Sequence, residues 1–195
     1  MGDPLRLRSL IRLPLLLAAV VAAMLAFTGA AFAAPATVHI KGGTTALTLN
    51  SGTAAVLTKN GVKVKPVFGG TASGATLSFP IEGGKVDAKT LAGTINHDGG
   101  IRFSAGGKEL TVQEFIIDTK AAQLTARVSG THTRIPLLNL NLKGAKISKG
   151  SSQVVISNVR ATLTSQAAAA LNKTFNVKLF KGGLTIGVAK VTAKI

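Results

Sequence analysis

The chain of 195 residues contains no cysteine, no tryptophan and no tyrosine, and its aromatic content rests on eight phenylalanines. Without cysteine there can be no disulfide, no thiolate ligand for a metal and no lipid attached to cysteine. Without tryptophan or tyrosine the chain lacks the aromatic platforms on which single-strand nucleic-acid binders stack bases. Any core must therefore be built mainly from valine, leucine, isoleucine and alanine.

Acidic residues are also scarce, with 7 Asp and Glu against 23 Lys and Arg, giving a net charge of +16. Such an excess attracts anionic polymers, for example wall polysaccharides, lipid headgroups or nucleic acid. Lysines also discourage edge-to-edge pairing of strands, and we favour this interpretation for most of them. The missing aromatic residues and the export predicted below argue against nucleic acid. The lysines we consider for binding an anionic polymer are Lys63, Lys65, Lys143, Lys146, Lys149, Lys178 and Lys181.

Catalytic motifs are absent from the sequence. It has no phosphate-binding Gly-Lys-Ser or Gly-Lys-Thr loop, no Gly-x-Ser-x-Gly elbow and no His-Glu-x-x-His pair. Glu109, Glu114 and Asp118 lie along one predicted strand and could supply a carboxylate pair of the kind that glycosidases use. Glu114 and Asp118 lie amid basic residues such as Arg127, so cross-strand ion pairs explain these two carboxylates better. The sequence therefore predicts that the protein is not an enzyme.

The first 33 residues have the three parts of a secretory signal peptide. Arginines come first, Leu13–Phe27 is an almost unbroken apolar run, and Ala31-Phe32-Ala33 is a small-x-small cleavage site. The rival interpretation is an uncleaved membrane anchor, since the run is close to the length that spans a bilayer. We predict a bacterial Sec-type signal peptide at 1–33, with no membrane span left after cleavage. The rest, 34–195, is then a secreted or cell-envelope single domain with a net charge of +14, from 20 basic and 6 acidic residues.

The stretch 93–130 has glycine-rich turn signals at regular intervals with short runs of period-two alternation between them. In 101–105, for example, Ile101 and Phe103 share one face. This alternation predicts half-buried strands, and the turns predict a four-stranded antiparallel meander. The phase of the alternation shifts at Gln113-Glu114, which predicts a β-bulge at that point.

Alternation and turn residues also predict strands outside that stretch. Pro66 marks its own strand as an edge strand, since proline cannot donate to a ladder. The fold class we expect is all-β: an antiparallel sandwich or partly closed barrel with two short helices. The further strands are predicted at 36–41, 45–50, 62–68, 75–81, 85–87, 134–142, 145–149, 153–157 and 184–195.

Two segments near the two ends of the domain resemble each other. The segments starting at Leu49 and Leu163 each suggest a strand, a helix capped by Ser51 or Ser165, a second strand, and then a Gly pair. Either the segment is duplicated, or two alanine-rich helices obey the same capping rules by chance. We expect the two helices to close the two open ends of the sandwich or barrel.

Three further groups of residues resemble the HtaA-domain family. The resemblance implies an exported, cell-surface β-rich domain of a family best known for binding haem, in which a tyrosine supported by histidine holds the haem. This chain has no tyrosine, so that ligand has no counterpart here. The resemblance rests on Gly93-Thr94-Ile95 with Ile101-Arg102-Phe103 and Gly107-Lys108-Glu109-Leu110, on Ala122-Gln123-Leu124-Thr125-Ala126, and on Ala161-Thr162-Leu163-Thr164 with the alanine run to Leu171 and Gly182-Gly183-Leu184.

The chain has three histidines, His39, His97 and His132, and no two of them have the short spacing that readily assembles a metal site. A lone imidazole can ligate haem iron, so His97 and His132 are the candidate cofactor ligands. The simpler interpretation, which we favour, is that scattered histidines are structural or exposed, with His97 a solvated turn residue.

We therefore predict a secreted or cell-envelope, non-catalytic binding or structural domain that is HtaA-like and carries no cofactor. One alternative is binding of haem or another small ligand through a histidine. Another is a cationic module that adheres to anionic cell-envelope polymers or to surface proteins. The sequence does not distinguish these alternatives, and it does not indicate the oligomeric state or how the protein is retained at a surface.

Overall fold

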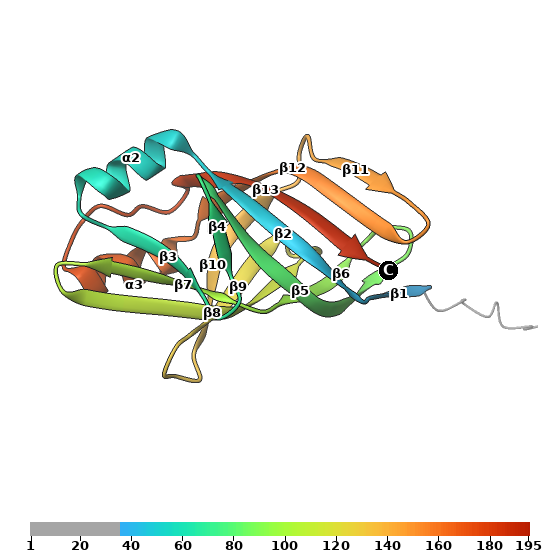
Figure 1. Ribbon diagram of the computed structural model, residues 1–195, viewed down its shortest axis with the longest axis horizontal. Helices are drawn as coiled ribbons and strands as arrows, with labels where there is room; N and C mark the ends of the chain where they lie inside the picture. Colours follow the sequence, from blue (N-terminus) through green and yellow to red (C-terminus); the bar gives the residue numbers. More distant parts are fainter. Residues whose placement is uncertain (1–35) are drawn as a thin grey trace, which may run out of the picture. The chain divides into compact units, whose positions relative to one another are not determined.

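The structure, a computed structural model, describes residues 36–195, so the predicted signal peptide lies outside the described part of the chain. That part contains thirteen strands and two short helices (Figure 1). The helices are α2 (Ser51–Lys59) and α3 (Ser165–Phe175). The strands are β1 (Thr37–Ile40), β2 (Gly42–Leu49), β3 (Lys63–Val67), β4 (Thr71–Ser73), β5 (Thr76–Asp87), β6 (Gly93–His97), β7 (Gly100–Ala105), β8 (Lys108–Asp118), β9 (Gln123–Val128), β10 (Arg134–Asn141), β11 (Lys146–Lys149), β12 (Gln153–Leu163) and β13 (Thr185–Lys194).

Eight of these strands close into an antiparallel barrel, in the order β5, β2, β13, β12, β10, β9, β8 and β6. Strand β6 closes the ring because it pairs with both β5 and β8. The remaining strands extend the wall: β1 and β4 pair with β5, β11 with β12, β7 with β8, and β3 with β7. The prediction of an all-β antiparallel fold with two short helices is confirmed, and of the two expected architectures, a sandwich or a partly closed barrel, the structure is a barrel, with a closed ring of strands. The strand expected at 85–87 is the end of the long β5.

The stretch 93–130 forms the four predicted strands, but the first two are not joined by a hairpin. Strands β6 and β7 both run antiparallel to β8, β6 along its C-terminal half and β7 along its N-terminal half. They are one long strand interrupted at Asp98 and Gly99, where Gly99 has φ +98°. The predicted meander is therefore wrong at this connection, because the glycine kinks the chain without reversing it. The interruption lets β6 join β5 while β7 carries the edge strand β3.

The β-bulge predicted at Gln113-Glu114 is confirmed. Glu114 has φ +54°, and the pairing of β8 with β9 shifts register between Gln113 and Ile116. The extra residue changes the phase of the strand, so that Val112 before the bulge and Phe115 after it are both buried. As a result β8 keeps an apolar face toward the core along its whole length.

The core inside the barrel is almost entirely aliphatic, as the composition predicts. Ala126 and Ala161 are fully buried, and Val112 is 1 % exposed. Phe79 and Phe115 form the one close ring pair of the described residues, edge to face with centroids 5.0 Å apart. Each fully buried valine, leucine, isoleucine or phenylalanine side chain stabilises the fold by about 1.5–3 kcal/mol.

The N-cap of each helix lies one residue earlier than the sequence predicts. The cap of α2 is Asn50, not Ser51, and its side chain accepts from the amide of Thr53. The cap of α3 is Thr164, not Ser165, and its hydroxyl accepts from the amide of Ala167. An N-cap side chain must reach the amide two or three residues ahead, and both serines lie inside the first turn instead.

The two helices lie at the same end of the barrel, so the expectation that they close opposite ends is wrong (Figure 1). Leu57 of α2 and Leu171 of α3 line one common cavity. The strand expected directly after α3 is also missing: residues 177–184 form an irregular segment. The side-chain amide of Asn172 donates to the carbonyl of Phe180 and accepts from its amide, at 2.8 and 2.9 Å. These bonds fold the segment back against α3.

Candidate functional site

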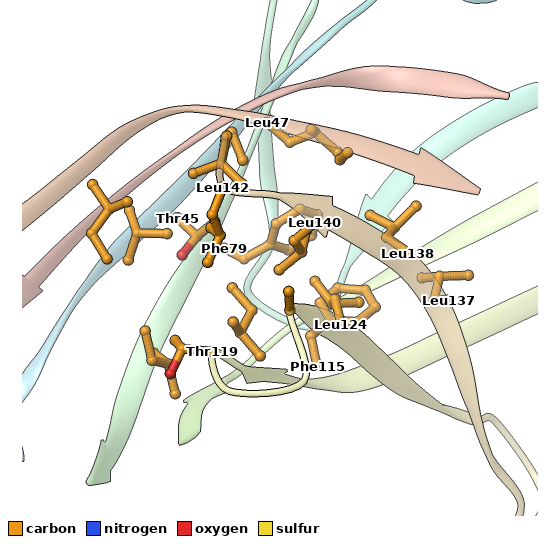
Figure 2. A pocket seen from close by; sticks show the side chains of 18 of the residues that line it. Thr45, Leu47, Phe79, Phe115, Thr119, Leu124, Leu137, Leu138, Leu140 and Leu142 are labelled. Carbon is orange, nitrogen blue, oxygen red and sulfur yellow. The ribbon is translucent and has the colours of Figure 1, made fainter. Parts of the chain in front are cut away.

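The barrel interior holds an apolar cavity of about 60 Å³ (Figure 2). Its wall comes from both halves of the chain, including Phe79 of β5, Leu140 of β10 and Val191 of β13. Only two of the lining residues carry a polar side-chain atom, Thr45 and Thr119. A cavity lined by hydrocarbon stays dry and accepts apolar molecules, as in engineered cavities of other proteins.

Two smaller cavities continue this space toward the two ends of the barrel. One, of about 50 Å³, lies under the helices and shares four wall residues with the main cavity: Leu47, Ile101, Leu137 and Leu138. The other, of about 20 Å³, shares four different ones: Ile95, Thr119, Ile156 and Val191. Figure 2 shows Leu137 and Leu138 toward one side of the main cavity and Thr119 and Leu142 toward the other. The interior is therefore a row of apolar spaces running from the helix-covered end toward the opposite end.

His97, a candidate haem ligand, lies in the barrel wall at the end of β6 and is 3 % exposed. Its Nε2 lies 2.7 Å from the hydroxyl of Thr45, and its Nδ1 lies 3.3 Å from the carbonyl oxygen of Phe115. The carbonyl can only accept, so Nδ1 carries the proton and Nε2 accepts from the hydroxyl. Burial lowers the pKa of His97 to about 4, which keeps the ring neutral near pH 7.

The interpretation of His97 as a solvated turn residue is therefore wrong. The sequence places it beside a glycine-rich turn, but the turn is the kink between β6 and β7, and His97 is a buried residue paired with Ile81 of β5. Both ring nitrogens are engaged in hydrogen bonds, so neither is free to bind an iron atom in this conformation.

His132, the other candidate ligand, is exposed in the loop 129–133 between β9 and β10. Figure 1 shows this loop projecting from the barrel. His97 is in the wall and His132 in the loop, so the fold does not bring the two into one site. Among residues 36–195 no group of three or more His, Cys, Asp or Glu side chains is close enough to hold a metal ion.

The seven candidate lysines fall into two groups. Lys63 and Lys65 on β3, with Lys178 and Lys181 after α3, lie at the helix-covered end, while Lys143, Lys146 and Lys149 lie in or next to β11 at the other end (Figure 1). Lys143 also borders an open polar hollow of about 350 Å³ on the outer surface, together with Asn141, Asn158, Arg160 and Val188. The fold thus divides these lysines between two ends.

The three carboxylates considered for catalysis each have a separate structural partner. Glu114 forms ion pairs with Arg127 and Arg134, and the bond from Arg127 lowers the pKa of Glu114. The cross-strand pairing predicted for this residue is confirmed. Glu109 lies 3.8 Å from Arg102. The ion pair predicted for Asp118 is wrong: among the described residues it has no ion pair and instead accepts the backbone amides of the turn that follows it. These contacts explain the carboxylates without a catalytic pair.

Sequence analysis missed Thr45 and the two exposed aliphatic residues Leu142 and Ile147. A signal existed for Thr45, which has the same phase as Leu47 and thus faces inward. No local signal exists for the exposure of Ile147, because it depends on what lies in front of its strand.

Neither helix in residues 36–195 is long and apolar enough to cross a membrane.

The fold is similar to solved structures from Corynebacterium glutamicum. The C-terminal domain of HtaA has a TM-score of 0.62 at 16% identity, with 80% of this chain and 98% of that chain covered. A domain-swapped dimer of a variant of that domain gives 0.53 at 17% identity, covering 74% and 91%. The heme binding protein HtaB gives 0.49 at 12% identity, covering 82% and 96%.

A search of curated proteins gives no match to this sequence. A family model does match: the model described as Htaa covers residues 60–178, more than half of the chain. This match confirms the resemblance drawn from the sequence, and it includes the bulged strand β8 and the helix α3. The chain belongs to the HtaA family.

Proposed function

We propose that this protein is a non-catalytic binding domain of the HtaA family that takes a small apolar ligand into its barrel. The observation that carries this proposal is the row of cavities with hydrocarbon walls, closed at one end by two helices. Binding sites are typically concave, mostly apolar and largely formed before the ligand arrives. A ligand in this space gains about 25 cal/mol for each Å² of apolar surface removed from water.

A non-catalytic role fits the polar groups next to the cavity. His97, a buried titratable side chain of the barrel wall, is bonded to the cavity-lining Thr45, is neutral and is held by two hydrogen bonds. The threonines that line the main cavity offer hydroxyl groups and no charge. A neutral wall of this kind can select a ligand by size and polarity, while general acid–base chemistry needs a group that titrates near the working pH.

The test is a titration of the purified protein with benzene and with dodecanol, followed by NMR of the methyl groups. We expect saturable shifts at wall residues such as Leu140 and Val191, with smaller effects on exposed methyl groups. The matched variant is Ala161→Leu, which fills the main cavity from a position that is fully buried in the wall. Its thermal unfolding would show whether it folds. Equal shifts in the variant and the wild type, or no shifts in either, would contradict the proposal.

Haem binding through a histidine is the second candidate function, and the exposure of His132 favours that residue over His97. In this arrangement the haem would lie on the surface by the loop 129–133, since the interior cavities are far smaller than a porphyrin. A haem titration followed by absorbance tests it. We expect any saturable Soret shift to be lost in His132→Ala and kept in Thr131→Ala, the matched loop variant. A shift that survives His132→Ala would exclude this ligand.

The third candidate is adhesion of an exported protein to anionic envelope polymers. It is supported by the net charge and by the hollow at Lys143 and Arg160. Co-sedimentation with cell-wall fractions at rising salt would test it, because binding of this kind weakens as salt screens the charges. Binding that persists in high salt, or is unchanged in Lys143→Met with Arg160→Met, would contradict it.

A further inference from the structure

Two aliphatic side chains at the β11 end are exposed even though they belong to the inner side of the wall. Leu142, which lines the main cavity, is 44 % exposed. Ile147 on β11 is paired with Ile156 on β12, and Ile156 lines the same cavity. Residues directly opposite each other in a ladder point to the same face, so Ile147 also points to the interior side. It is nevertheless 57 % exposed, so the wall is open in front of it.

The opening is bordered by β11 on one side and by two turns on the other. Among the strands of residues 36–195, β11 pairs only with β12, so none of them lies beside its other edge. Opposite lie the β8–β9 turn, which contributes Thr119 and Ala122 to the main cavity, and the β5–β6 turn at 88–92. The hydroxyl of Thr119 accepts from the amide of Gly93, which fixes the first of these turns to β6.

One lysine spans this opening. Lys149 is paired with the buried Val154, so its side chain also starts on the inner side of β11. Its ammonium donates to the carbonyl oxygens of Ala88 and Lys89 at 3.0 and 3.2 Å, across the gap from the β5–β6 turn. Carbonyl oxygens are neutral partners, and among the described residues Lys149 has no ion pair within 4 Å. The ammonium is thus available to a negatively charged group.

The charges around the opening favour an anion. Lys89 and Lys120 lie in the two turns beside it, together with Lys149 on β11. The nearby carboxylates, Asp87 and Asp118, each accept backbone amides of their own turns. The three lysines outnumber these two carboxylates, which leaves an excess of positive charge beside the opening.

Resting on the proposed function, we propose that this opening is the entry for a single-chain amphiphile with an anionic head group. The chain would lie in the barrel interior, and the carboxylate or phosphate head would exchange the carbonyl partners of Lys149 for itself. We define the portal as Leu142, Ile147, Lys149, Thr119 and Ala122. A charge-assisted bond to an anion is stronger than one to a neutral carbonyl, so the exchange favours the bound state.

The interior is long enough for such a chain. From Leu137 under the helices to Leu142 at the portal, the residue directly after β10, the chain advances by five residues, or roughly 17 Å if fully extended. This is comparable with a medium-length acyl chain. The spaces along that line are separate in the unliganded protein, and the side chains between them, Leu47 and Ile101 among others, must move apart to join them.

The experiment measures displacement of cis-parinarate fluorescence by three competitors below their micellar concentrations: dodecanoate, dodecyl phosphate and dodecanol. Wild type is compared with Lys149→Met, which keeps the length of the side chain and removes its charge. Lys63→Met, on β3 at the helix-covered end, is the matched control for net charge. Ala161→Leu is the variant that fills the cavity, with thermal unfolding as its folding control.

We expect Lys149→Met to bind both anionic competitors roughly tenfold more weakly, while dodecanol changes by less than about twofold. Lys63→Met should match the wild type. Tighter binding of dodecyl phosphate than of dodecanoate would identify phosphate as the head group, and the reverse would identify a carboxylate.

Two results would overturn the inference. If dodecanol competes as well as dodecanoate, and Lys149→Met has no effect while Ala161→Leu abolishes binding, the cavity binds apolar ligands and the portal has no role. The same conclusion follows if Lys63→Met weakens binding as much as Lys149→Met. If no competitor displaces the probe and benzene causes no shifts, the proposed function itself fails.

Discussion

The two ends of this barrel are formed by different kinds of secondary structure and differ in how well their apolar side chains are buried. At one end α2 and α3 cover the interior with buried leucines, and the segment after α3 is bonded back onto the helix by Asn172. At the other end the interior is bordered by turns, by the edge strand β11 and by exposed Leu142 and Ile147. The apolar side chains at the helix-covered end are buried as in a protein core, whereas those at the β11 end are exposed, as expected for the proposed portal. The comparison shows that one antiparallel barrel can have one end covered by packed helices and the other end bordered by exposed aliphatic residues.

The largest expected effect separates the two ends by packing. Leu171→Ala removes a side chain that is 2 % exposed and should destabilise the protein by about 2–5 kcal/mol. Leu142→Ala removes one that is 44 % exposed and should cost less than about 1 kcal/mol. Urea unfolding of the two variants measures the difference. Similar losses at the two positions would mean that the β11 end is as tightly packed as the helix end.

The second prediction concerns the wall between the ends, where burial lowers the pKa of His97 to about 4 from an ordinary value of 6.5. The unfolded chain then binds a proton that the folded chain does not, so stability should fall as the pH drops from about 6.5 to about 4. The loss approaches roughly 3 kcal/mol at the lower pH. Chemical unfolding at a series of pH values measures this slope.

The control for this slope is His97→Gln, which keeps a hydrogen-bonding side chain and removes the titration. The pKa values of Asp87 and Glu114 are lowered from ordinary values of 3.8 and 4.5, so their contributions are lost only below about pH 4.5, and most of the His97 window lies above that. If the stability of His97→Gln falls between pH 6.5 and 4 as steeply as that of the wild type, the slope does not come from His97, and the wall around this residue is open to water.

The smallest expected effects compare two residues that each make a pair of hydrogen bonds to the backbone. Asn172→Ala breaks two partly buried bonds to Phe180 and should cost about 1–2 kcal/mol. Lys149→Met breaks two exposed bonds to the β5–β6 turn and should change stability by less than about 0.5 kcal/mol. Thermal unfolding measures both. A larger loss in Lys149→Met would give that lysine a structural role in place of the ligand-binding role proposed above.

Features set by neighbouring residues could be predicted from the sequence. The alternation of Ile101 and Phe103 predicts a strand, and the shift of phase at Gln113-Glu114 predicts the bulge, because a strand has a period of two. Pro66 marks β3 as an edge strand, and β3 is the last strand of its side of the sheet. The helices could be predicted from alanine content and caps, although each cap lies one residue earlier than expected.

Features set by distant residues could not be predicted in this way. His97 is hydrogen-bonded to Thr45, which is 52 residues away in the sequence, so its environment depends on a distant part of the chain. The glycines after His97 are compatible with a hairpin or with a kink, and only the pairing of β6 with both β5 and β8 selects the kink. Similarly, no local pattern in α2 or α3 shows that both cover the same end. The candidate portal depends on the absence of a strand beside β11, which no run of residues encodes.

The position of β13 between β2 and β12 has a consequence for the order in which the chain can fold. The ring cannot be completed without the strand Thr185–Lys194, which follows all the other strands of the ring in sequence. The hairpins from β7 to β9 can form early because their partners are close in sequence, whereas the pairing of β2 with β13 joins residues at opposite ends of the domain. A chain synthesised from its N-terminus therefore stays an unclosed sheet with an exposed apolar face until β13 has been made.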